Sequence, residues 1–454
     1  MSRFYLTTAI DYSNGDPHIG HAYEKVGADV IARFHRLAGE DVHYVIGMDE
    51  HGQKVAQEAA AQGRPPQELV DDLAARFQAV WDRLSISHDD FIRTTEPRHR
   101  QAVQALVRRI RDAGDLYRDR YEGYYCTGCE AFKREPELEE GRCPIHPSRE
   151  IAWTEEENWF FRLSAYRDRL IEHIEAHPEF IEPESRRNEI LRLLEGGLED
   201  ISASRSRVPW GVPFPDEEGH TVYVWFDALP NYISAIGFPG DEFHTWWPAA
   251  LHVIGKDITR FHCVIWPAML LSAGLDLPHT VWGHGFVKIA GGKLSKSEAR
   301  LLDLDQLIDR HGPDAFRYFL LREIPWDRDR DFPSVDAFLK QFDERYNADL
   351  ANDLGNLLNR TVSMSRKYRD GIVRRFADTE LDAQIEGALD AYEKAMAEGQ
   401  LHEGLDAAMS IVRAANGFID TEQPWKLARE PESQERLDDV LAALVRGLGT
   451  TALM

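Results

Sequence analysis

The first fifty residues contain a strand, a helix and a second strand in the order that a parallel sheet requires. The runs Phe4–Ala9 and Val42–Ile46 are short, apolar and typical of buried strands. Between them, apolar residues recur at spacings of three and four and so share one helix face: Ile19, Tyr23, Val26, Val30, Phe34 and Leu37. This pattern predicts a doubly wound, Rossmann-like parallel α/β sheet, whose ligands bind where strands end and helices begin.

The strand pattern is interrupted and then resumes. From about Tyr117 to Trp210, turn residues, acidic residues and cysteines crowd together, which predicts an inserted domain. The runs Val222–Phe226 and Leu251–Ile254 resemble strands again, so we expect the sheet to close after the insertion. From about Phe338 the chain becomes helical, and one apolar stripe predicts an all-α helix bundle: Leu350, Leu354, Leu357 and Leu358.

Charge and hydropathy narrow the class of protein. The formal net charge of −25 favours solubility and, taken alone, argues against a nucleic-acid partner, although a local basic face can sit on an acidic protein. No apolar run approaches the roughly 20 residues that span a bilayer. The start of the chain has no signal-peptide pattern. We therefore expect a cytoplasmic protein that does not bind a membrane.

Two histidines stand at the start of the first helix, in the segment Pro17–His21. His18 and His21 are three residues apart and lie on the same side of the first turn. Gly20 lets a ligand approach closely, and a helix N-terminus favours anions. The segment fits a triphosphate, although a helix cap with incidental histidines would give the same letters.

A second cationic segment spans Gly291–Ser297. Lys293 and Lys296 follow a glycine pair, so this loop can close on a polyphosphate and neutralise the charge that develops on it. A solvated surface loop is the common alternative for such a run. Together, the two segments resemble the HIGH and KMSKS signatures of class I aminoacyl-tRNA synthetases, with Leu294 in place of the usual methionine.

Three of the four cysteines are clustered. Cys126 and Cys129 are followed, after thirteen residues, by Cys143 and His146. Three thiolates and one imidazole in two pairs suit tetrahedral zinc at a closed, structural site, with one ion per chain. In a chain without an export signal, a metal is favoured over a disulfide framework. Unligated core cysteines with a surface histidine are the alternative.

Two aromatic groups lie in the second half of the predicted sheet domain. They are Trp225, Ala228 and Tyr232, spaced as on one helix face, and Phe261, His262 and Trp266. Aromatic walls suit a small apolar ligand, and a thioether is polarizable and pairs well with rings. Asp49 follows the second strand, where a carboxylate could hold an α-ammonium group. Plain core packing explains these spacings too, and from spacing alone it is the more common outcome.

Matches to one family run in order through almost the whole chain. They are Thr7–Tyr12, Pro17–His21, Asp49–Gly52, the cysteine cluster, Tyr223–Ala228, Gly255–Ile258, Phe261–His262, Trp266–Leu270 and KLSKS. The chain therefore resembles the methionyl-tRNA synthetases, in the form that carries a single zinc knuckle.

The resemblance implies a role for particular residues. The implied methionine-binding residues are Ile10, Tyr12, Asp49, Trp225, Ala228, Tyr232, Phe261, His262 and Trp266. The implied ATP-binding residues are His18, Gly20, His21, Gly255, Asp257, Lys293 and Lys296, of which His18, His21, Lys293 and Lys296 would stabilise the reacting phosphates. The implied anticodon-binding residues are Asn356, Arg360 and Trp425. Without the resemblance, these last three residues would be interpreted as part of helix packing and surface charge.

The resemblance also implies an activity and its partners. We expect ATP-dependent activation of L-methionine to methionyl-adenylate, with Mg²⁺ accompanying ATP, followed by transfer to the 3′ end of tRNA(Met). The implied domains are a catalytic domain in two halves at 1–116 and 221–290, a zinc-knuckle insertion at 117–220, a KMSKS and stem-contact region at 291–345 and an anticodon-binding bundle at 346–454. Because the chain ends within or just after its last helices, a monomer is expected.

Two alternatives stay open at this point. Another class I synthetase, for leucine, isoleucine, valine or cysteine, would share both signatures. However, the insertion is short for the large editing domain of the first three, and a cysteine enzyme would need its zinc at the amino-acid site. A catalytically weak paralog that only binds tRNA is the second alternative, and it would not need both phosphate-binding segments.

Overall fold

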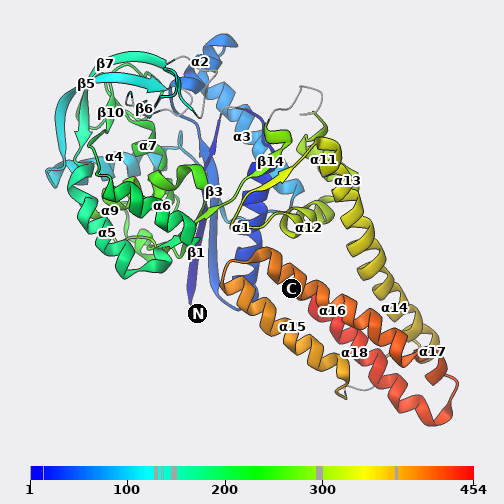
Figure 1. Ribbon diagram of the computed structural model, residues 1–454. Coiled ribbons are helices and arrows are strands. Elements are labelled where there is room, and N and C mark those ends of the chain that lie inside the picture. Colours follow the sequence, from blue (N-terminus) through cyan, green and yellow to red (C-terminus); the bar gives the residue numbers. More distant parts are fainter. Residues whose placement is uncertain are drawn as a thin grey trace. The chain divides into compact units, whose positions relative to one another are not determined.

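The computed structural model describes residues 2–13, 15–126, 131–133, 135, 138–144, 151–292, 300–373 and 377–454. These residues form two compact units (Figure 1). Unit 1 comprises Met1–Pro17 and Ala28–His284, and unit 2 comprises His18–Gly27 and Gly285–Met454. No helix in the described part of the chain is both long and apolar enough to cross a bilayer.

A seven-stranded parallel sheet forms the centre of unit 1. Its strands run in the order β2-β3-β1-β12-β13-β8, and β4 pairs with β3 off this path. Their bounds are β1 Arg3–Thr8, β2 Asp11–Tyr12, β3 Asp41–Asp49, β4 Asp90–Arg93, β8 Ile181–Glu182, β12 Leu251–Gly255 and β13 Thr280–His284. β1 and β3 are buried along most of their length, as parallel strands covered on both faces must be. This confirms the predicted doubly wound sheet.

Helices connect the strands of this sheet. They are α1 Ile19–Leu37, whose first turns belong to unit 2, then α2 Gln53–Ala61, α3 Pro66–Arg83, α4 Pro97–Asp112, α5 Arg167–Ala176, α6 Glu184–Glu195, α7 Val224–Ala228, α8 Asn231–Ser234 and α9 Trp266–Ser272. A π-helical turn, Phe261–Ile265, leads directly into α9. β1 pairs with β3 on one side and with β12 on the other, so the strand order reverses at β1 and β12. Ligands of doubly wound folds bind at the carboxyl ends of the strands at such a reversal.

The predicted insertion contains a separate antiparallel sheet. Its four strands are β6 Ala131–Lys133, β5 Leu116–Cys126, β7 Ile151–Phe161 and β9 Ile201–Ser202, in that order. The long hairpin partners β5 and β7 stay in register from Leu116 to Cys126. Within the same stretch of sequence, β8 returns to the edge of the main sheet, where it pairs with β13.

One strand prediction is wrong. The run Val222–Phe226 does not join the main sheet, because only Thr221–Val222 is extended (β11) and it pairs with β10, Ser204–Arg205. Helix α7 then begins at Val224. An apolar run of five residues fits a buried strand and a buried helical turn equally well, so its period could not decide between them.

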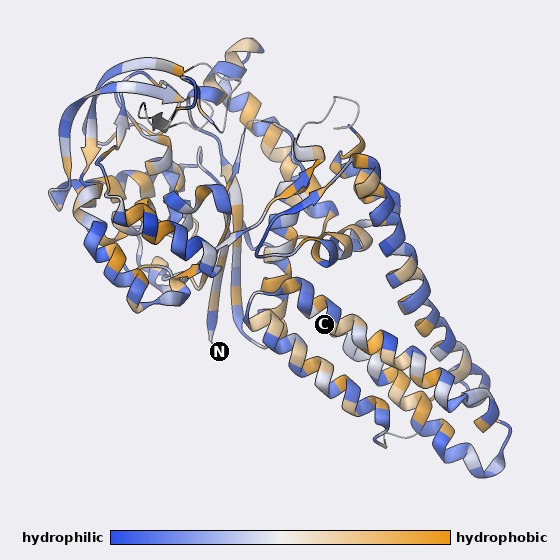
Figure 2. Ribbon diagram, viewed as in Figure 1, coloured by the Kyte–Doolittle hydropathy of each residue, from blue (hydrophilic) through white to orange (hydrophobic). Residues whose placement is uncertain are grey.

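Unit 2 combines a two-stranded parallel ladder with helices. β14 (Val287–Ile289) pairs with β15 (Arg330–Phe332), and the helices are α11 Leu304–His311, α12 Pro313–Glu323, α13 Val335–Arg345, α14 Gly355–Arg369, α15 Glu380–Ala397, α16 Leu401–Glu422, α17 Pro424–Leu427 and α18 Gln434–Leu453. Figure 2 shows polar and apolar residues alternating along α15, α16 and α18, as amphipathic helices require. The apolar faces of the bundle meet in a core that includes Leu357, Val412 and Leu444, which confirms the predicted bundle.

The predicted apolar stripe of the bundle is only partly correct. Leu357 is fully buried, but Leu358 is 52% exposed. Tyr346–Leu354 forms π-helical turns between α13 and α14, which shift the helix face relative to a regular helix.

Within unit 2, the first turns of α1 pack closely on the segment before β15. The indole of Trp326 lies over Gly27, where a Cβ atom would come within 2.2 Å of the ring. The hydroxyl of Tyr23 lies 3.3 Å from the carbonyl oxygen of Ile324 and 3.0 Å from that of Pro325. A glycine is therefore required at position 27 because the Trp326 ring packs directly against the helix backbone, and not because of its backbone angles.

Candidate active site

The end of β3 and the short strand β2 form one side of the candidate amino-acid site. β2 pairs with β3 so that Tyr12 lies opposite Asp49. Ser13 donates to the carbonyl oxygen of Asp49 from its backbone nitrogen, at 2.9 Å, and from its hydroxyl, at 2.8 Å. Ile10 lies beside Gly47, where a Cβ atom would come within 3.0 Å of its methyl group. The three residues predicted from this half of the sheet, Ile10, Tyr12 and Asp49, are thus brought together at its carboxyl edge.

The predicted aromatic residues also come together. The rings of Trp225 on α7 and Phe261 at the π-helical turn are stacked, with centroids 3.6 Å apart and planes 11° from parallel. Tyr232 on α8 lies 6.1 Å from the ring of Trp266 and 5.6 Å from that of His262. Two pairs of neighbouring elements, α7 with α8 and the π-helical turn with α9, therefore contribute rings to one wall.

Two polar side chains of this wall, Tyr232 and His262, are bonded to each other. Nδ1 of His262 donates to the carbonyl oxygen of Ile258 at 3.0 Å, so the ring carries its proton there when neutral. Nε2 of His262 is then the acceptor for the hydroxyl of Tyr232, at 2.6 Å. Tyr5 donates to the carbonyl oxygen of Tyr232 at 2.6 Å and anchors α8 to β1. A ligand side chain here meets a phenol and an imidazole that are already paired, and two buried indole nitrogens, of Trp225 and Trp266, that have no hydrogen-bond partner among the described residues.

A second buried histidine, which the sequence reasoning missed, supports Tyr232. The ring of His252 on β12 lies 4.3 Å from that of Tyr232, and Nδ1 lies 2.6 Å from the hydroxyl of Thr7 on β1. Burial and the nearby His262 hold the pKa of His252 well below its usual value. The signal in the sequence was a lone histidine in the apolar strand Leu251–Gly255.

In unit 2, the two histidines of the HIGH segment are stacked. Their rings are 3.7 Å apart and 16° from parallel. The backbone nitrogen of Gly20 donates to Nδ1 of His18 at 3.1 Å, and that of His18 donates to Nδ1 of His21 at 3.2 Å. Both Nδ1 atoms therefore act as acceptors, which leaves the proton of each neutral ring on Nε2.

Electrostatics keeps these two rings neutral. Desolvation lowers the pKa of His18. Desolvation, with the positive fields of His18 and of Lys25 one turn later, lowers the pKa of His21 well below its usual value. The pair is thus equipped to donate two Nε2–H groups and to carry no charge of its own near neutral pH.

The predicted ATP-binding residues of unit 1 lie at the reversal of the strand order. Gly255 is the last residue of β12, and Asp257 lies in the turn Lys256–Ile258 that follows. Gly255 is buried and Asp257 is exposed.

The predicted anticodon residues lie on two helices of the bundle, α14 and α17. Asn356 and Arg360 are one turn apart on α14. Arg360 forms an ion pair of 2.6 Å with Asp420, near the end of α16. Trp425 follows on α17 and is 38% exposed, which is unusual for an indole.

Comparison with known proteins decides the family. A family model described as tRNA synthetases class I (M) matches residues 4–151 and 136–362. The methionine–tRNA ligase of Thermotoga maritima is 44% identical over 463 residues, which cover 100% of this chain and 72% of that protein. That of Thermosynechococcus vestitus is 46% identical, covering 95% of this chain and 83% of its own length. The chain belongs to the class I methionyl-tRNA synthetases.

Solved structures agree with this membership. The Mycobacterium tuberculosis methionyl-tRNA synthetase in complex with methionyl-adenylate has a TM-score of 0.94 and 42% identity, covering 100% of this chain and 90% of that chain. The apo form of the same enzyme has a TM-score of 0.86. The chain is therefore an ATP-dependent aminoacyl-tRNA ligase of this family, with methionine, ATP and tRNA(Met) as its substrates.

Several predicted residues lie outside the described part of the chain. They are Lys293 and Lys296 of the KLSKS segment and Cys129 and His146 of the cysteine cluster. The other two cysteines of the cluster, Cys126 and Cys143, are buried and form no disulfide. The residues that the structure describes contain no group of three or more histidine, cysteine or acidic side chains that could hold a metal.

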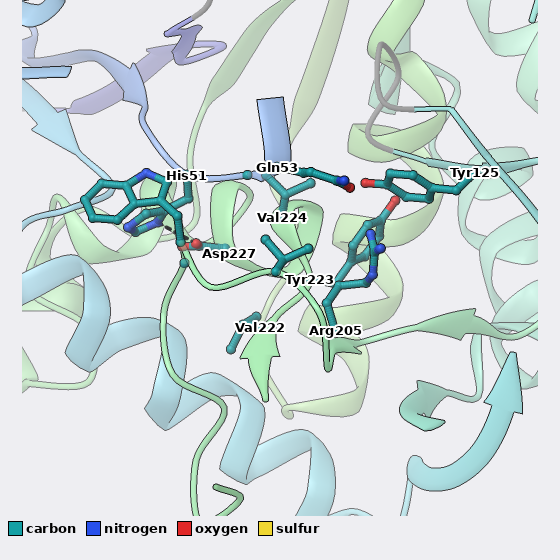
Figure 3. Close-up of a pocket in the computed structure, with 12 residues that line it drawn as sticks. His51, Gln53, Tyr125, Arg205, Val222, Tyr223, Val224 and Asp227 are labelled. Atoms are coloured by element: carbon teal, nitrogen blue, oxygen red, sulfur yellow. Dashed lines mark hydrogen bonds and ion pairs between the residues drawn. The ribbon is translucent and has the colours of Figure 1, made fainter. Parts of the chain in front are cut away.

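A small pocket lies between the end of β3 and the insertion in unit 1 (Figure 3). Its lining includes His51, Gln53, Tyr125, Arg205 and Asp227. The guanidinium of Arg205 lies over the ring of Tyr125 at 4.2 Å. No motif or spacing connects these residues, and the bonded pair His51 and Asp227 lies 176 positions apart.

Proposed function

We propose that the aromatic wall and the end of β3 bind methionine. The observation that carries this proposal is the pair of contacts within the wall, the stack of Trp225 on Phe261 and the hydrogen bond between Tyr232 and His262. Apolar ring faces, together with a phenol and an imidazole that are already paired, favour an apolar, polarizable thioether and disfavour a charged side chain, which would lose its hydration without a charged partner. Ala228, which is buried on the same short helix as Trp225, leaves room beside the rings.

The carboxylate of Asp49 is proposed to bind the α-ammonium group. Asp49 is buried at the carboxyl end of a central parallel strand, next to Tyr12. Its backbone carbonyl accepts hydrogen bonds from Ser13, so the backbone that carries the carboxylate is held in place. Ile10 would line the apolar side of the same pocket.

The HIGH segment is proposed to bind the phosphates of ATP. The Nε2–H groups of His18 and His21 would donate to phosphate oxygens, and Gly20 would allow the phosphate chain to approach. Asp257 would hold the ribose beside Gly255. Lys293 and Lys296 would neutralise the leaving pyrophosphate, and Mg²⁺ would shield the phosphate charge when it is bound.

The reaction needs no nucleophile from the protein. The methionine carboxylate attacks the α-phosphorus of ATP, which forms methionyl-adenylate and releases pyrophosphate. The 3′-terminal ribose hydroxyl of tRNA then attacks the adenylate carbonyl and releases AMP. The protein contributes by orienting the reactants and stabilising the charge that develops on phosphate oxygens. Such an enzyme is expected to act in the cytoplasm, where its tRNA is used.

The bundle is proposed to read the anticodon. Asn356 and Arg360 present hydrogen-bonding groups from one face of α14, and the exposed indole of Trp425 offers a surface on which an unpaired base can stack.

A structural zinc is proposed in the insertion. Cys126 and Cys143 are buried thiols without a disulfide, and soft thiolates suit zinc. A tight turn at Glu140 and Gly141, closed by two hydrogen bonds between Glu139 and Arg142, directs the chain into Cys143. Zinc would tie this turn to the end of β5, with Cys129 and His146 as the remaining ligands.

Metal analysis of the purified native protein tests the zinc proposal. We expect about one zinc per chain, and we expect Cys143→Ser to lose it and to unfold the insertion at a lower temperature. A native protein without zinc would overturn the proposal.

The decisive experiment on the amino-acid site is ATP–pyrophosphate exchange with each of the twenty amino acids, without tRNA. We expect exchange with methionine alone. Exchange driven by another amino acid would overturn the pocket assignment. Absence of exchange with every amino acid would overturn the assignment of the phosphate-binding residues as well.

A further inference from the structure

The carboxylate of Asp227 is the centre of a buried polar network in unit 1. Its two oxygens are both occupied, one by Nδ1 of His51 at 2.7 Å and the other by Nε2 of His99 at 2.9 Å. The carboxylate and the His99 ring are fully buried, and His51 is almost so. Because an ionised carboxylate only accepts hydrogen bonds, both imidazoles donate to it. A buried carboxylate is stable only when it is paired in this way.

One arm of the network reaches the loop that carries Asp49. Figure 3 shows the His51 ring facing Asp227 at the edge of the small pocket. The backbone nitrogen of His51 lies 3.5 Å from the Asp49 carboxylate. The indole of Trp210 donates to the carbonyl oxygen of Glu50, and Gly52 donates back to that of Trp210. The three residues after β3 are therefore held from outside the loop, two by Trp210 and His51 by Asp227 on α7.

The other arm reaches the helix that carries Tyr232. Nδ1 of His99, on α4, lies 2.9 Å from the hydroxyl of Ser234, on α8. Asn231, at the start of α8, donates to the carbonyl oxygen of Ala228 at 2.8 Å. Asp227 itself lies between Trp225 and Ala228 on α7. One carboxylate thus connects all three elements that supply the ammonium-binding acid and two of the aromatic rings.

We propose that Asp227 is a positioning residue for methionine activation, which sets the distance between the Asp49 loop and the aromatic wall through His51 and His99. This inference rests on the proposed methionine site. Buried ionic networks can often be replaced by apolar side chains without loss of stability. Stability alone therefore does not account for a charged carboxylate at this position. Burial alone would raise the pKa of Asp227, but the fields and hydrogen bonds of His51 and His99 outweigh it and lower the pKa to about 2.

The first test measures KM in pyrophosphate exchange for Asp227→Asn. The amide would place an N–H group against one of the two donating imidazoles, so one arm is lost. We expect KM for methionine to rise about tenfold and KM for ATP to change less than about twofold. The matched control is Asp29→Asn, another fully buried carboxylate of unit 1, which accepts hydrogen bonds from Arg33 and Ser87. The control should lower stability without this selective effect.

The second test uses the ring nitrogen through which His51 contacts Asp227. An asparagine amide reproduces Nδ1 of histidine, and a glutamine amide reproduces Nε2. His51→Asn can therefore keep its bond to Asp227, whereas His51→Gln cannot. We expect the methionine KM of His51→Asn to stay within about threefold of the native value and that of His51→Gln to rise about tenfold. These two variants carry the test if Asp227→Asn does not fold.

A third measurement locates the effect at the ammonium group. Equilibrium binding is compared for methionine and for 4-(methylthio)butanoic acid, which lacks the amino group. We expect His51→Gln to weaken methionine about tenfold and the des-amino compound less than about twofold, because only methionine uses Asp49.

Two results would overturn the inference. One is an equal rise in KM for methionine and ATP in Asp227→Asn. The other is equal behaviour of His51→Asn and His51→Gln. If the native enzyme exchanges with methionine, either result leaves the proposed function intact. If the native enzyme does not exchange with methionine, the proposed function itself is wrong.

Discussion

The indole of Trp225 lies flat on the phenyl ring of Phe261, with 3.6 Å between ring centroids and 11° between ring planes. Trp225 belongs to a helix of five residues and Phe261 to a π-helical turn, so neither ring is held by a long element. Each ring therefore depends on the other for its orientation, and the wall of the proposed methionine site is expected to respond to the loss of either one.

Trp225→Ala tests this dependence. Loss of the stack and of the buried indole area should raise KM for methionine about 10- to 100-fold in pyrophosphate exchange, with KM for ATP changed less than about twofold. Trp153→Ala is the control, because that indole is 57% exposed and lies in the insertion. Equal effects of both substitutions would contradict the assignment of Trp225.

Lys296→Ala tests the loop role that the KLSKS segment predicts. Removal of one cation that stabilises the leaving pyrophosphate should slow adenylate formation about 100- to 1,000-fold while methionine affinity changes less than about twofold. Single-turnover adenylate formation and equilibrium methionine binding measure the two effects. Lys367→Ala, on exposed surface of α14, should change neither. Equal losses of rate and affinity would mean that Lys296 acts elsewhere.

Trp425→Ala tests the anticodon assignment. Stacking of a base on an aromatic ring contributes about 1–3 kcal/mol, so kcat/KM for tRNA charging should fall about 10- to 100-fold. Pyrophosphate exchange without tRNA should be unchanged. Leu358→Ala, at another exposed apolar residue of the bundle, serves as the control for a general loss of surface. If exchange falls together with charging, Trp425 has a structural role.

His252 predicts how stability depends on pH. Burial and His262 hold the pKa of His252 well below 6.5 in the folded protein, whereas the unfolded chain binds this proton near pH 6.5. Between the folded and unfolded pKa values the unfolded state binds the extra proton, so the free energy of unfolding falls as the pH is lowered below about 6.5.

Urea unfolding between about pH 5 and 7.5 measures this slope. His252→Asn, whose amide can still reach Thr7, should reduce it by up to about 1.4 kcal/mol per pH unit. Parallel stability curves for the native protein and the variant would show that His252 is not protonated differently in the two states.

Gly27→Ala tests the close packing of Trp326 on α1. A Cβ atom at Gly27 would come within 2.2 Å of the indole, so the substitution should lower the free energy of unfolding by about 1–3 kcal/mol. Gly387→Ala is a matched helical control, since its Cβ meets nothing within 4 Å, and it should stabilise the protein by up to about 1 kcal/mol. Thermal or denaturant unfolding measures the free energy of unfolding of both variants. Similar changes in this free energy for Gly27→Ala and Gly387→Ala would contradict a steric clash at Gly27.

The sequence predicted the elements whose signals are local. The period of α1 and the apolar runs of β1, β3 and β12 are each contained in a few residues, and all four elements form where they were expected. The pairing of Trp225 with Phe261 could be anticipated only as two separate groups, because spacing does not report which short elements pack together.

Three features that could not be predicted from the sequence have three different physical causes. Val222–Phe226 was ambiguous, since a buried apolar run has no polar face from which a period can be read. The network of His51, His99 and Asp227 was invisible because its members come from three elements that only the tertiary fold brings together. Leu358 was assigned to the core because a regular helix was assumed through the preceding π-helical turns.

The π-helical turn Phe261–Ile265 has a consequence for how the amino-acid site can vary. A π turn accommodates one residue more than an α turn, and each residue of a helix rotates the following side chain by about 100°. Deletion of a single residue here would restore a regular helix and swing Phe261 and His262 away from Trp225 and Tyr232, while Trp266 kept its place. Substitutions would adjust the proposed pocket gradually, whereas a change in the length of this helix would displace two of its rings in one step.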